Sequence, residues 1–178
     1  MEFVEAALRL LARRDDVYLL LVGKGPQRPA VEARCDEWDQ MERFRFTGSV
    51  PYGEVPLYLA LAEVGVAPFQ PTAHPALRTA GFYWSPLKVF EYMAMGLPVV
   101  TTDIPPLNRV IRSGQEGLLV SEGEVEGLAG AIAALLDDPA AAQAMGRRAR
   151  ERVVAEYSWA RHCERLEAVL EEAVGAFN

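Results

Sequence analysis

The chain of 178 residues has the length of one ordinary domain and can bury a sizeable core. Apolar residues make up 51% and charged residues 24%, which excludes a disordered chain, and the net charge of −7 argues against a nucleic-acid partner. No uninterrupted apolar run has the length of a membrane span. Glu2 and Glu5 stand where a basic leader region would be, so we expect no signal peptide.

The first two predicted elements are a helix and a buried strand. Apolar residues recur at helical spacing over residues 2–13, and residues 17–22 are continuously apolar, as in the middle of a parallel sheet. Gly23 and Gly25 follow that strand and precede a second helix. Glycines at such a turn leave room for a phosphate, but they can also serve only to turn the chain, and the full GxGxxG spacing is absent.

Two further strands and a helix are predicted next. Residues 44–47 and 64–67 are short apolar strands, and residues 54–61 have helical periodicity. Val50 lies in the turn after the first of these strands. A turn at that place can contact a nucleobase through its backbone groups or can simply join strand to helix, and the residues alone favour neither.

Residues 70–85 form a long segment without periodicity, which is usual for functional loops. Its aromatic residues Phe82, Tyr83 and Trp84 could stack on a sugar or a base, or could cover the sheet. For Phe82 and Trp84 we favour the second role. Arg78 could reach a phosphate, although an isolated loop arginine is more often solvated.

The clearest local signals lie in residues 85–100, SPLKVFEYMAMGLPVV. Ser85 is the predicted N-cap and Pro86 the first helical residue. Gly96 is placed to end the helix, and the β-branched run at residues 99–102 predicts a strand.

This helix is predicted to have an apolar arc and a polar flank. The apolar arc consists of Leu87, Val89, Phe90, Met93 and Ala94. The polar flank carries Lys88 and Glu91. Free N–H groups and the positive dipole make the helix start an anion site, and the dipole disfavours a cation in the first turn unless an anion lies between them. We therefore expect a phosphate near Lys88, and Glu91 can accept hydrogen bonds from a pair of hydroxyls.

The remaining chain continues the alternation of helices and strands. The predicted elements are a short helix at 107–111, a strand at 117–120 and helices at 124–136, 140–157 and 159–177. The predicted helix at 140–157 carries four arginines: Arg147, Arg148, Arg150 and Arg152. They could approach a phosphate or an anionic membrane, but a solvated helix face of mixed charge is the interpretation that we favour.

Cysteine and histidine are sparse. Cys35 and Cys163 lack a CxxC spacing, which predicts two free thiols in a reducing cytoplasm. His74 and His162 have no partner at metal-ligand spacing, so we predict no metal site.

The order of elements predicts an α/β fold, a Rossmann-like, doubly wound parallel sheet with helices on both faces, forming a single domain over residues 1–178. In such folds the ligand lies outside the carboxyl ends of the strands. Gly23, Val50, Lys88 and Glu91 all follow predicted strand ends, which predicts a site at that edge.

The segment 85–100 resembles the donor-binding segment of retaining glycosyltransferases of family 4, which have the two-domain GT-B fold. Their pattern is Glu-x7-Glu followed by Ala/Met-Ala-x-Gly-x-Pro-Val-Val. Glu91 matches the second acid, and Ser85-Pro86-Leu87-Lys88 matches a Ser-Pro-x-Lys sub-pattern. Tyr83 stands where the first acid is expected, which leaves the contacts to the donor sugar open.

The resemblance implies a role for each matching residue. Glu91 would hold the ribose of a nucleotide sugar, while Lys88 and the loop before the helix would wrap the diphosphate. The turn at Gly23 and Gly25 would face the donor cleft, and Val50 would meet the nucleobase edge. No metal and no cofactor is implied, because the nucleotide sugar is a substrate.

The resemblance covers only the C-terminal half of such enzymes. It implies an acceptor-binding N-terminal domain absent from this chain, to which the helix at 159–177 would cross back, and an interior first strand absent before Met1. We expect an unfilled slot between sheet edges, since unpaired edges invite pairing. The explanation would be a truncated chain, a lost start, or a strand supplied by a partner or a strand-swapped homo-oligomer.

Our first hypothesis is the nucleotide-sugar-binding half of a retaining glycosyltransferase that moves a hexosyl group from a UDP- or GDP-sugar to a glycan, lipid or small-molecule acceptor. The isolated chain would bind nucleotide weakly and transfer nothing. The enzyme would be cytoplasmic, or peripheral at the membrane through the other domain. The alternatives are another GT-B enzyme such as a nucleotide-sugar epimerase or a phosphorylase, a non-catalytic binding or scaffolding module, and a flavodoxin-like domain without a nucleotide site.

Overall fold

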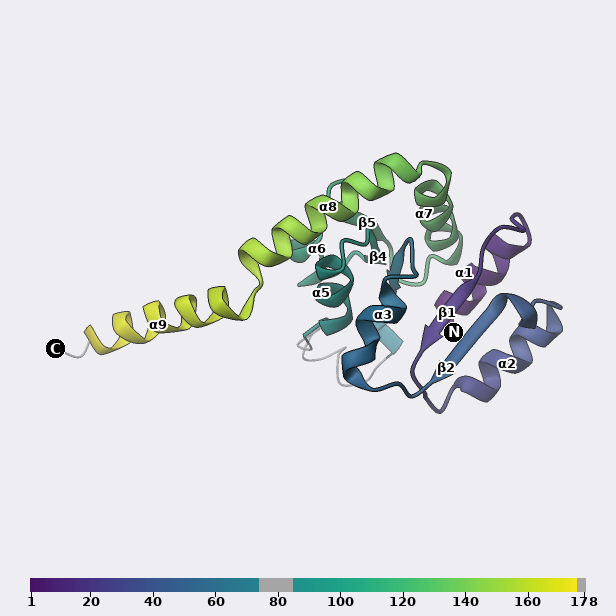
Figure 1. Ribbon diagram of the computed structural model, residues 1–178, viewed down its shortest axis with the longest axis horizontal. Helices are drawn as coiled ribbons and strands as arrows, with labels where there is room; N and C mark the ends of the chain where they lie inside the picture. Colours follow the sequence, from purple (N-terminus) through teal and green to yellow (C-terminus); the bar gives the residue numbers. More distant parts are fainter. Residues whose placement is uncertain (74–84, 176–178) are drawn as a thin grey trace.

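The computed structural model describes residues 1–73 and 85–175, in which helices alternate with parallel strands (Figure 1). The strands are β1 (Leu19–Val22), β2 (Phe44–Gly48), β3 (Gly65–Ala67), β4 (Val99–Thr102) and β5 (Gly117–Val120). The α-helices are α1 (Glu2–Leu11), α2 (Arg28–Glu37), α3 (Val55–Leu59), α5 (Leu87–Ala94), α6 (Leu107–Val110), α7 (Val125–Asp137), α8 (Pro139–Glu156) and α9 (Trp159–Gly175). Short 3-10 helices are η1 (Met41–Arg43), η2 (Tyr52–Glu54) and η3 (Pro71–Ala73). The predicted strands are all present, and the α/β class is confirmed.

The described strands form two parallel sheets, β1–β2 and β3–β4–β5, where we expected one sheet. In the larger sheet Val99 of β4 lies between Gly65 of β3 and Gly117 of β5. In the smaller sheet Leu19 is opposite Phe44. Within the described residues no hydrogen-bonded ladder joins the two sheets.

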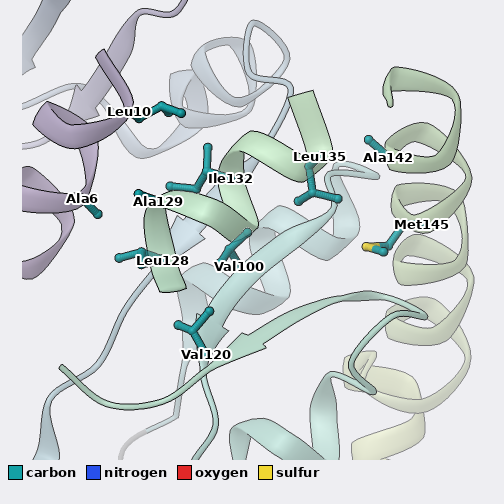
Figure 2. Packing of buried hydrophobic residues seen from close by; sticks show 10 residues of the cluster. All are labelled: Ala6, Leu10, Val100, Val120, Leu128, Ala129, Ile132, Leu135, Ala142 and Met145. Carbon is teal, nitrogen blue, oxygen red and sulfur yellow. The ribbon is translucent and has the colours of Figure 1, made fainter. Parts of the chain in front are cut away.

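Helices cover both faces of the larger sheet because consecutive residues of a strand point to opposite sides. Val100 packs with residues of α1, α7 and α8, and Figure 2 shows this cluster around Leu128 and Ile132. Its neighbour Val99 packs on the other side, with Val89 and Met93 of α5 and with residues of α6 and α8. All four residues of β4 are consequently buried, as the central strand of a doubly wound sheet requires.

Helix α1 connects the two sheets because it is buried on two sides. Ala6 and Leu10 contribute to the cluster around α7. Val4, Leu8 and their neighbours pack instead against α2, β1 and β2, including Phe44. The two-sided burial of one helix therefore holds the smaller sheet to the rest of the fold, without backbone pairing between the described strands.

Helix α9 differs from the other helices because every residue in it is exposed, and it projects away from the body of the molecule (Figure 1). Its large apolar side chains have exposed fractions from 50% to 82%; they are Trp159, Leu166, Val169, Leu170 and Val174. Among the described helices, none combines the length and the apolar character needed to cross a bilayer.

Arg147, Arg148 and Arg150 of α8 are exposed, which agrees with the solvated face that we favoured, whereas Arg152 is half-buried. Arg148 Nε donates to the Gln115 carbonyl at 2.9 Å, and Arg152 donates to the Arg109 carbonyl at 2.9 Å. Arg150 donates to the Ala94 carbonyl at the end of α5. The interpretation was therefore wrong only for Arg152, whose guanidinium group also lies near the carboxylates of Glu116 and Glu156.

Candidate functional site

Helix α5 begins one residue later than predicted. Leu87 is its first residue and Pro86, with ψ of 61°, is the N-cap residue, so the assignment of Ser85 as N-cap was wrong. Among the described residues, the Ser85 side chain makes no hydrogen bond to an N–H group of α5. Instead, the Ser85 carbonyl accepts from the Leu87 N–H at 2.9 Å, and the Pro86 carbonyl accepts from the Val89 N–H at 2.8 Å. The Lys88 N–H has no backbone acceptor among the described residues.

The apolar arc of α5 is narrower than predicted. Val89 and Met93 are fully buried, and the ring of Phe90 lies 5.3 Å from the ring of Tyr157. Leu87, however, is 65% exposed, so this member of the predicted apolar arc does not pack in the core. Residues two apart on a helix are separated by about 200° around its axis, which places Leu87 opposite Val89.

The structure brings Lys88 to the carboxyl ends of β3 and β4. The Lys88 Nζ lies 5.3 Å from the centre of the Phe69 ring. Phe69 lies just after β3, which ends at Ala67. The Phe69 N–H donates to Thr102 Oγ1 at 2.8 Å, and Thr102 ends β4. The predicted start of the anion site therefore lies at the predicted edge of the sheet.

Glu91 lies on the same side of α5 as Lys88, because residues three apart are neighbours on a helix. Its side chain is half-buried. Within residues 1–73 and 85–175, no side chain pairs with its carboxylate. Leu87, Lys88 and Glu91 thus form an open surface of one apolar group, one cation and one anion.

Sequence reasoning missed the contact that seats α5 on the sheet. Gly65 begins β3, and a Cβ atom at that position would lie 2.5 Å from Cδ2 of Tyr92. The ring of Tyr92 therefore occupies the space that a larger residue would take. Burial raises the pKa of the Tyr92 phenol, and the nearby Glu91 charge adds to this rise.

The turn after β1 forms a second group of predicted site residues. Gly23 has a φ of 123°, which L side chains rarely adopt, and its N–H donates to the Gly48 carbonyl at 3.0 Å. Gly25 is exposed and Val50 is half-buried, two residues beyond the end of β2. The described residues include no hydrogen bond or ion pair between this group and α5. Lys88 and Glu91 lie on the same side of α5, apart from this group.

Several predicted residues lie outside the described residues: His74, Arg78, Phe82, Tyr83 and Trp84. The described part of the chain contains no group of three His, Cys, Asp or Glu side chains that could hold a metal ion.

Residues 1–138 match the family model described as Glycosyl transferases group 1. The chain belongs to this family. A relative in Mycobacterium tuberculosis named glycogen synthase is 30% identical over 88% of this chain and 35% of its own length. Another from that organism, named GDP-mannose-dependent alpha-(1-6)-phosphatidylinositol monomannoside mannosyltransferase, is 31% identical over 86% of this chain and 39% of its own length.

Solved structures agree with this membership. Sucrose-phosphate synthase from Thermosynechococcus elongatus superposes with a TM-score of 0.77 at 28% identity, covering 97% of this chain and 42% of that chain. Anabaena HepE in complex with UDP has a TM-score of 0.76 at 17% identity, covering 94% of this chain and 44% of that chain, and shows the fold alone. These neighbours are GT-B glycosyltransferases. The group 1 glycosyltransferase domain described here thus spans about two fifths of the length of the proteins that it matches.

Proposed function

We propose that this group 1 glycosyltransferase domain binds the donor nucleotide sugar of a retaining hexosyltransferase. The observation that carries the proposal is the pair Lys88 and Glu91 on one open side of α5, at the carboxyl ends of β3 and β4. A cation beside the N-terminal end of a helix suits a diphosphate, and a carboxylate one turn further on suits the two hydroxyls of a ribose. No metal ion or other cofactor is required.

In the reaction, the bond between the anomeric carbon of the sugar and a diphosphate oxygen breaks, and a bond from that carbon to the acceptor oxygen forms on the same face. The bonding electron pair stays on the departing diphosphate, and the proton of the acceptor hydroxyl passes to the solvent. Charge therefore develops on the leaving group. Lys88 and the N–H groups at the start of α5 would stabilise that charge by being oriented before the reaction begins.

The donor is a UDP-sugar or a GDP-sugar. Two similar proteins support these choices: one relative is a GDP-mannose-dependent mannosyltransferase by name, and the solved HepE structure is a complex with UDP. Gly23 and Gly25 would line the donor cleft, and Val50 would meet the base through its backbone. Ser85, Pro86 and Leu87 would contribute the loop around the diphosphate, while Tyr83 would face the donor sugar.

A second domain would supply the acceptor site, which takes a glycan, a lipid or a small molecule. Helix α9 supports this proposal, because its exposed apolar residues, such as Trp159 and Leu166, need a partner surface. The enzyme would work in the cytoplasm, peripherally at a membrane if that domain binds lipid. Where no strand from a preceding segment of the chain fills the slot between the two sheets, a strand exchanged within a homo-oligomer would fill it.

A thermal-shift titration with UDP, GDP and ADP tests the donor site. Ligand at a hundred times its Kd should stabilise the chain by about 2.7 kcal/mol. Glu91→Ala should abolish the shift caused by the bound nucleotide. Glu151→Ala is the matched control, since Glu151 is also a helical glutamate, exposed on α8, and should leave the shift unchanged. If no nucleotide raises the melting temperature at millimolar concentration, the donor site is wrongly assigned.

A further inference from the structure

The Lys88 ammonium group lies against an aromatic face. Its Nζ is 5.3 Å from the centre of the Phe69 ring, within the range of a cation–π contact. Within residues 1–73 and 85–175, no carboxylate forms an ion pair with Lys88. In that part of the chain, the charge-directed contact of this lysine is therefore with a neutral ring, which attracts the cation through its quadrupole.

The backbone of Phe69 is held by Thr102. The Phe69 N–H donates to Thr102 Oγ1 at 2.8 Å, and the same hydroxyl donates to the Phe69 carbonyl at 3.0 Å. Thr102 is fully buried at the end of β4. Phe69 also packs on the buried cluster that contains Val89 and Met93 of α5. The backbone and the ring of Phe69 are thus fixed by the sheet and by the same helix that carries Lys88.

A ring differs from a carboxylate as a partner for this lysine. An ion pair would neutralise the ammonium and compete with an incoming phosphate, whereas an aromatic face leaves the full positive charge in place. The three N–H donors of a lysine also cannot all point at one ring, so donors remain for phosphate oxygens. A flexible side chain held in one region loses less conformational entropy when it binds an anion.

From this arrangement we infer that Phe69 is a positioning residue that orders the Lys88 ammonium for the diphosphate of the donor, with Thr102 as the support of Phe69. The inference rests on the proposed function, because it assigns a role within that donor site. It predicts that Phe69 contributes to affinity only through Lys88 and only for ligands that carry phosphate.

The test compares Phe69→Leu, which removes the aromatic face and keeps an apolar side chain, with Phe69→Tyr, which keeps the face. Isothermal titration of the whole chain with UDP and with GDP gives the Kd. For the nucleotide that binds, Phe69→Leu should raise the Kd roughly three-fold, the size of an exposed cation–π contact, and Phe69→Tyr should restore it. The matching free nucleoside, uridine or guanosine, should bind the wild type and Phe69→Leu equally.

A double-mutant cycle separates positioning from packing. In the Lys88→Met background, Phe69→Leu should leave the Kd unchanged, because no cation remains to be ordered. An equal loss of affinity in both backgrounds would show that Phe69 acts by packing and would overturn the inference.

A ligand-free measurement examines the pair directly. The ring should shift the Lys88 ε-methylene proton resonances upfield, and Phe69→Leu should remove that shift while Phe69→Tyr keeps it. If the shift is present and neither nucleotide binds the wild type, the proposed function is wrong and the role of Phe69 falls with it. If a nucleotide binds and the Kd of Phe69→Leu equals that of the wild type, the proposed function stands and only this inference is wrong.

Discussion

Gly146 of α8 lies against Gly96, the residue that follows the C-cap of α5. A Cβ atom on Gly146 would overlap the Gly96 carbonyl oxygen and lie 2.9 Å from the carbonyl carbon and 3.2 Å from the Pro98 nitrogen. All of these neighbours are backbone atoms, which cannot rotate away as a side chain can. The absence of a side chain at Gly146 therefore sets how closely α8 approaches the helix of the candidate site.

Gly146→Ala should lower the free energy of unfolding by about 2 kcal/mol or more, because the backbone of α5 or α8 must move. Urea denaturation of the variant and the wild type measures the difference. Gly130→Ala is the control. Gly130 lies in α7, and apart from its chain neighbours and the nearby backbone of α7, no atom lies within 4 Å of the position that an alanine methyl group would take. This change should therefore stabilise the chain by up to about 1 kcal/mol. Equal effects of the two changes would contradict the close approach.

Arg150→Met should lower stability by about 1 kcal/mol, because the Ala94 carbonyl at the end of α5 loses its donor. Thermal unfolding followed by circular dichroism measures this loss. Arg147→Met removes the same charge from the same helix, and Arg147 is exposed without a hydrogen-bond partner in the described part of the chain. A similar loss for both variants would mean that net charge, and not the hydrogen bond, is responsible.

Glu116 should make stability depend on pH. Its side chain is fully buried, and burial raises the pKa of the carboxyl group. Two hydrogen bonds, from the Arg112 side chain at 2.9 Å and from the Arg112 N–H at 2.9 Å, lower this pKa by more than burial raises it. The folded-state pKa lies below the ordinary value of 4.5. The stabilisation is therefore complete above pH 4.5 and is lost as the pH falls through the folded-state pKa.

Glu116→Gln should consequently cost about 1–3 kcal/mol at pH 7, and the gap to the wild type should narrow below pH 4. Urea denaturation at both pH values measures the gap. Glu2→Gln should behave oppositely, because burial raises the pKa of Glu2, so its ionised form at pH 7 is disfavoured by folding. If the difference in free energy of unfolding between Glu116→Gln and the wild type does not change with pH, the lowered pKa of Glu116 is refuted.

The two thiols should differ in reactivity. Cys163 is exposed on α9, whereas Cys35 is buried, and burial raises the pKa of its thiol to about 11. Because the thiolate is the reactive form, a thiol-specific reagent at pH 8 should modify Cys163 rapidly and leave Cys35 unmodified. Cys163→Ser should abolish the fast phase, and Cys35 should react only after denaturation in urea. Rapid reaction of Cys35 in the native chain would show that its burial is wrong.

The position of Lys88 and Glu91 on one side of a helix could be predicted from their spacing alone. Residues three apart are neighbours on any helix, whatever surrounds it. The ends of the strands could also be predicted from the sequence, because β-branched runs such as residues 99–102 are bounded by turn residues. The N-cap was misplaced by one residue because a serine before a proline satisfies the same local pattern whether or not its side chain reaches the backbone.

The contact between Phe69 and Lys88 could not be predicted from local sequence patterns. Phe69, Thr102 and Lys88 lie on three separate segments, and only the pairing of β3 with β4 and the seat of α5 bring them together. The same holds for the arginines of α8. Their charge pattern correctly indicated a solvated face for Arg147, Arg148 and Arg150, but only the crossing of α8 over α5 brings Arg150 to the Ala94 carbonyl.

By itself, then, the amino-acid sequence determined the order of helices and strands, the α/β class and the two charged residues of α5, because periodicity and caps depend on neighbours along the chain. The tertiary structure alone decided that the strands form two sheets joined by α1, that Leu87 is exposed, and that Phe69 lies against Lys88. Those features depend on packing between residues far apart in the sequence, and such packing leaves no local pattern to read.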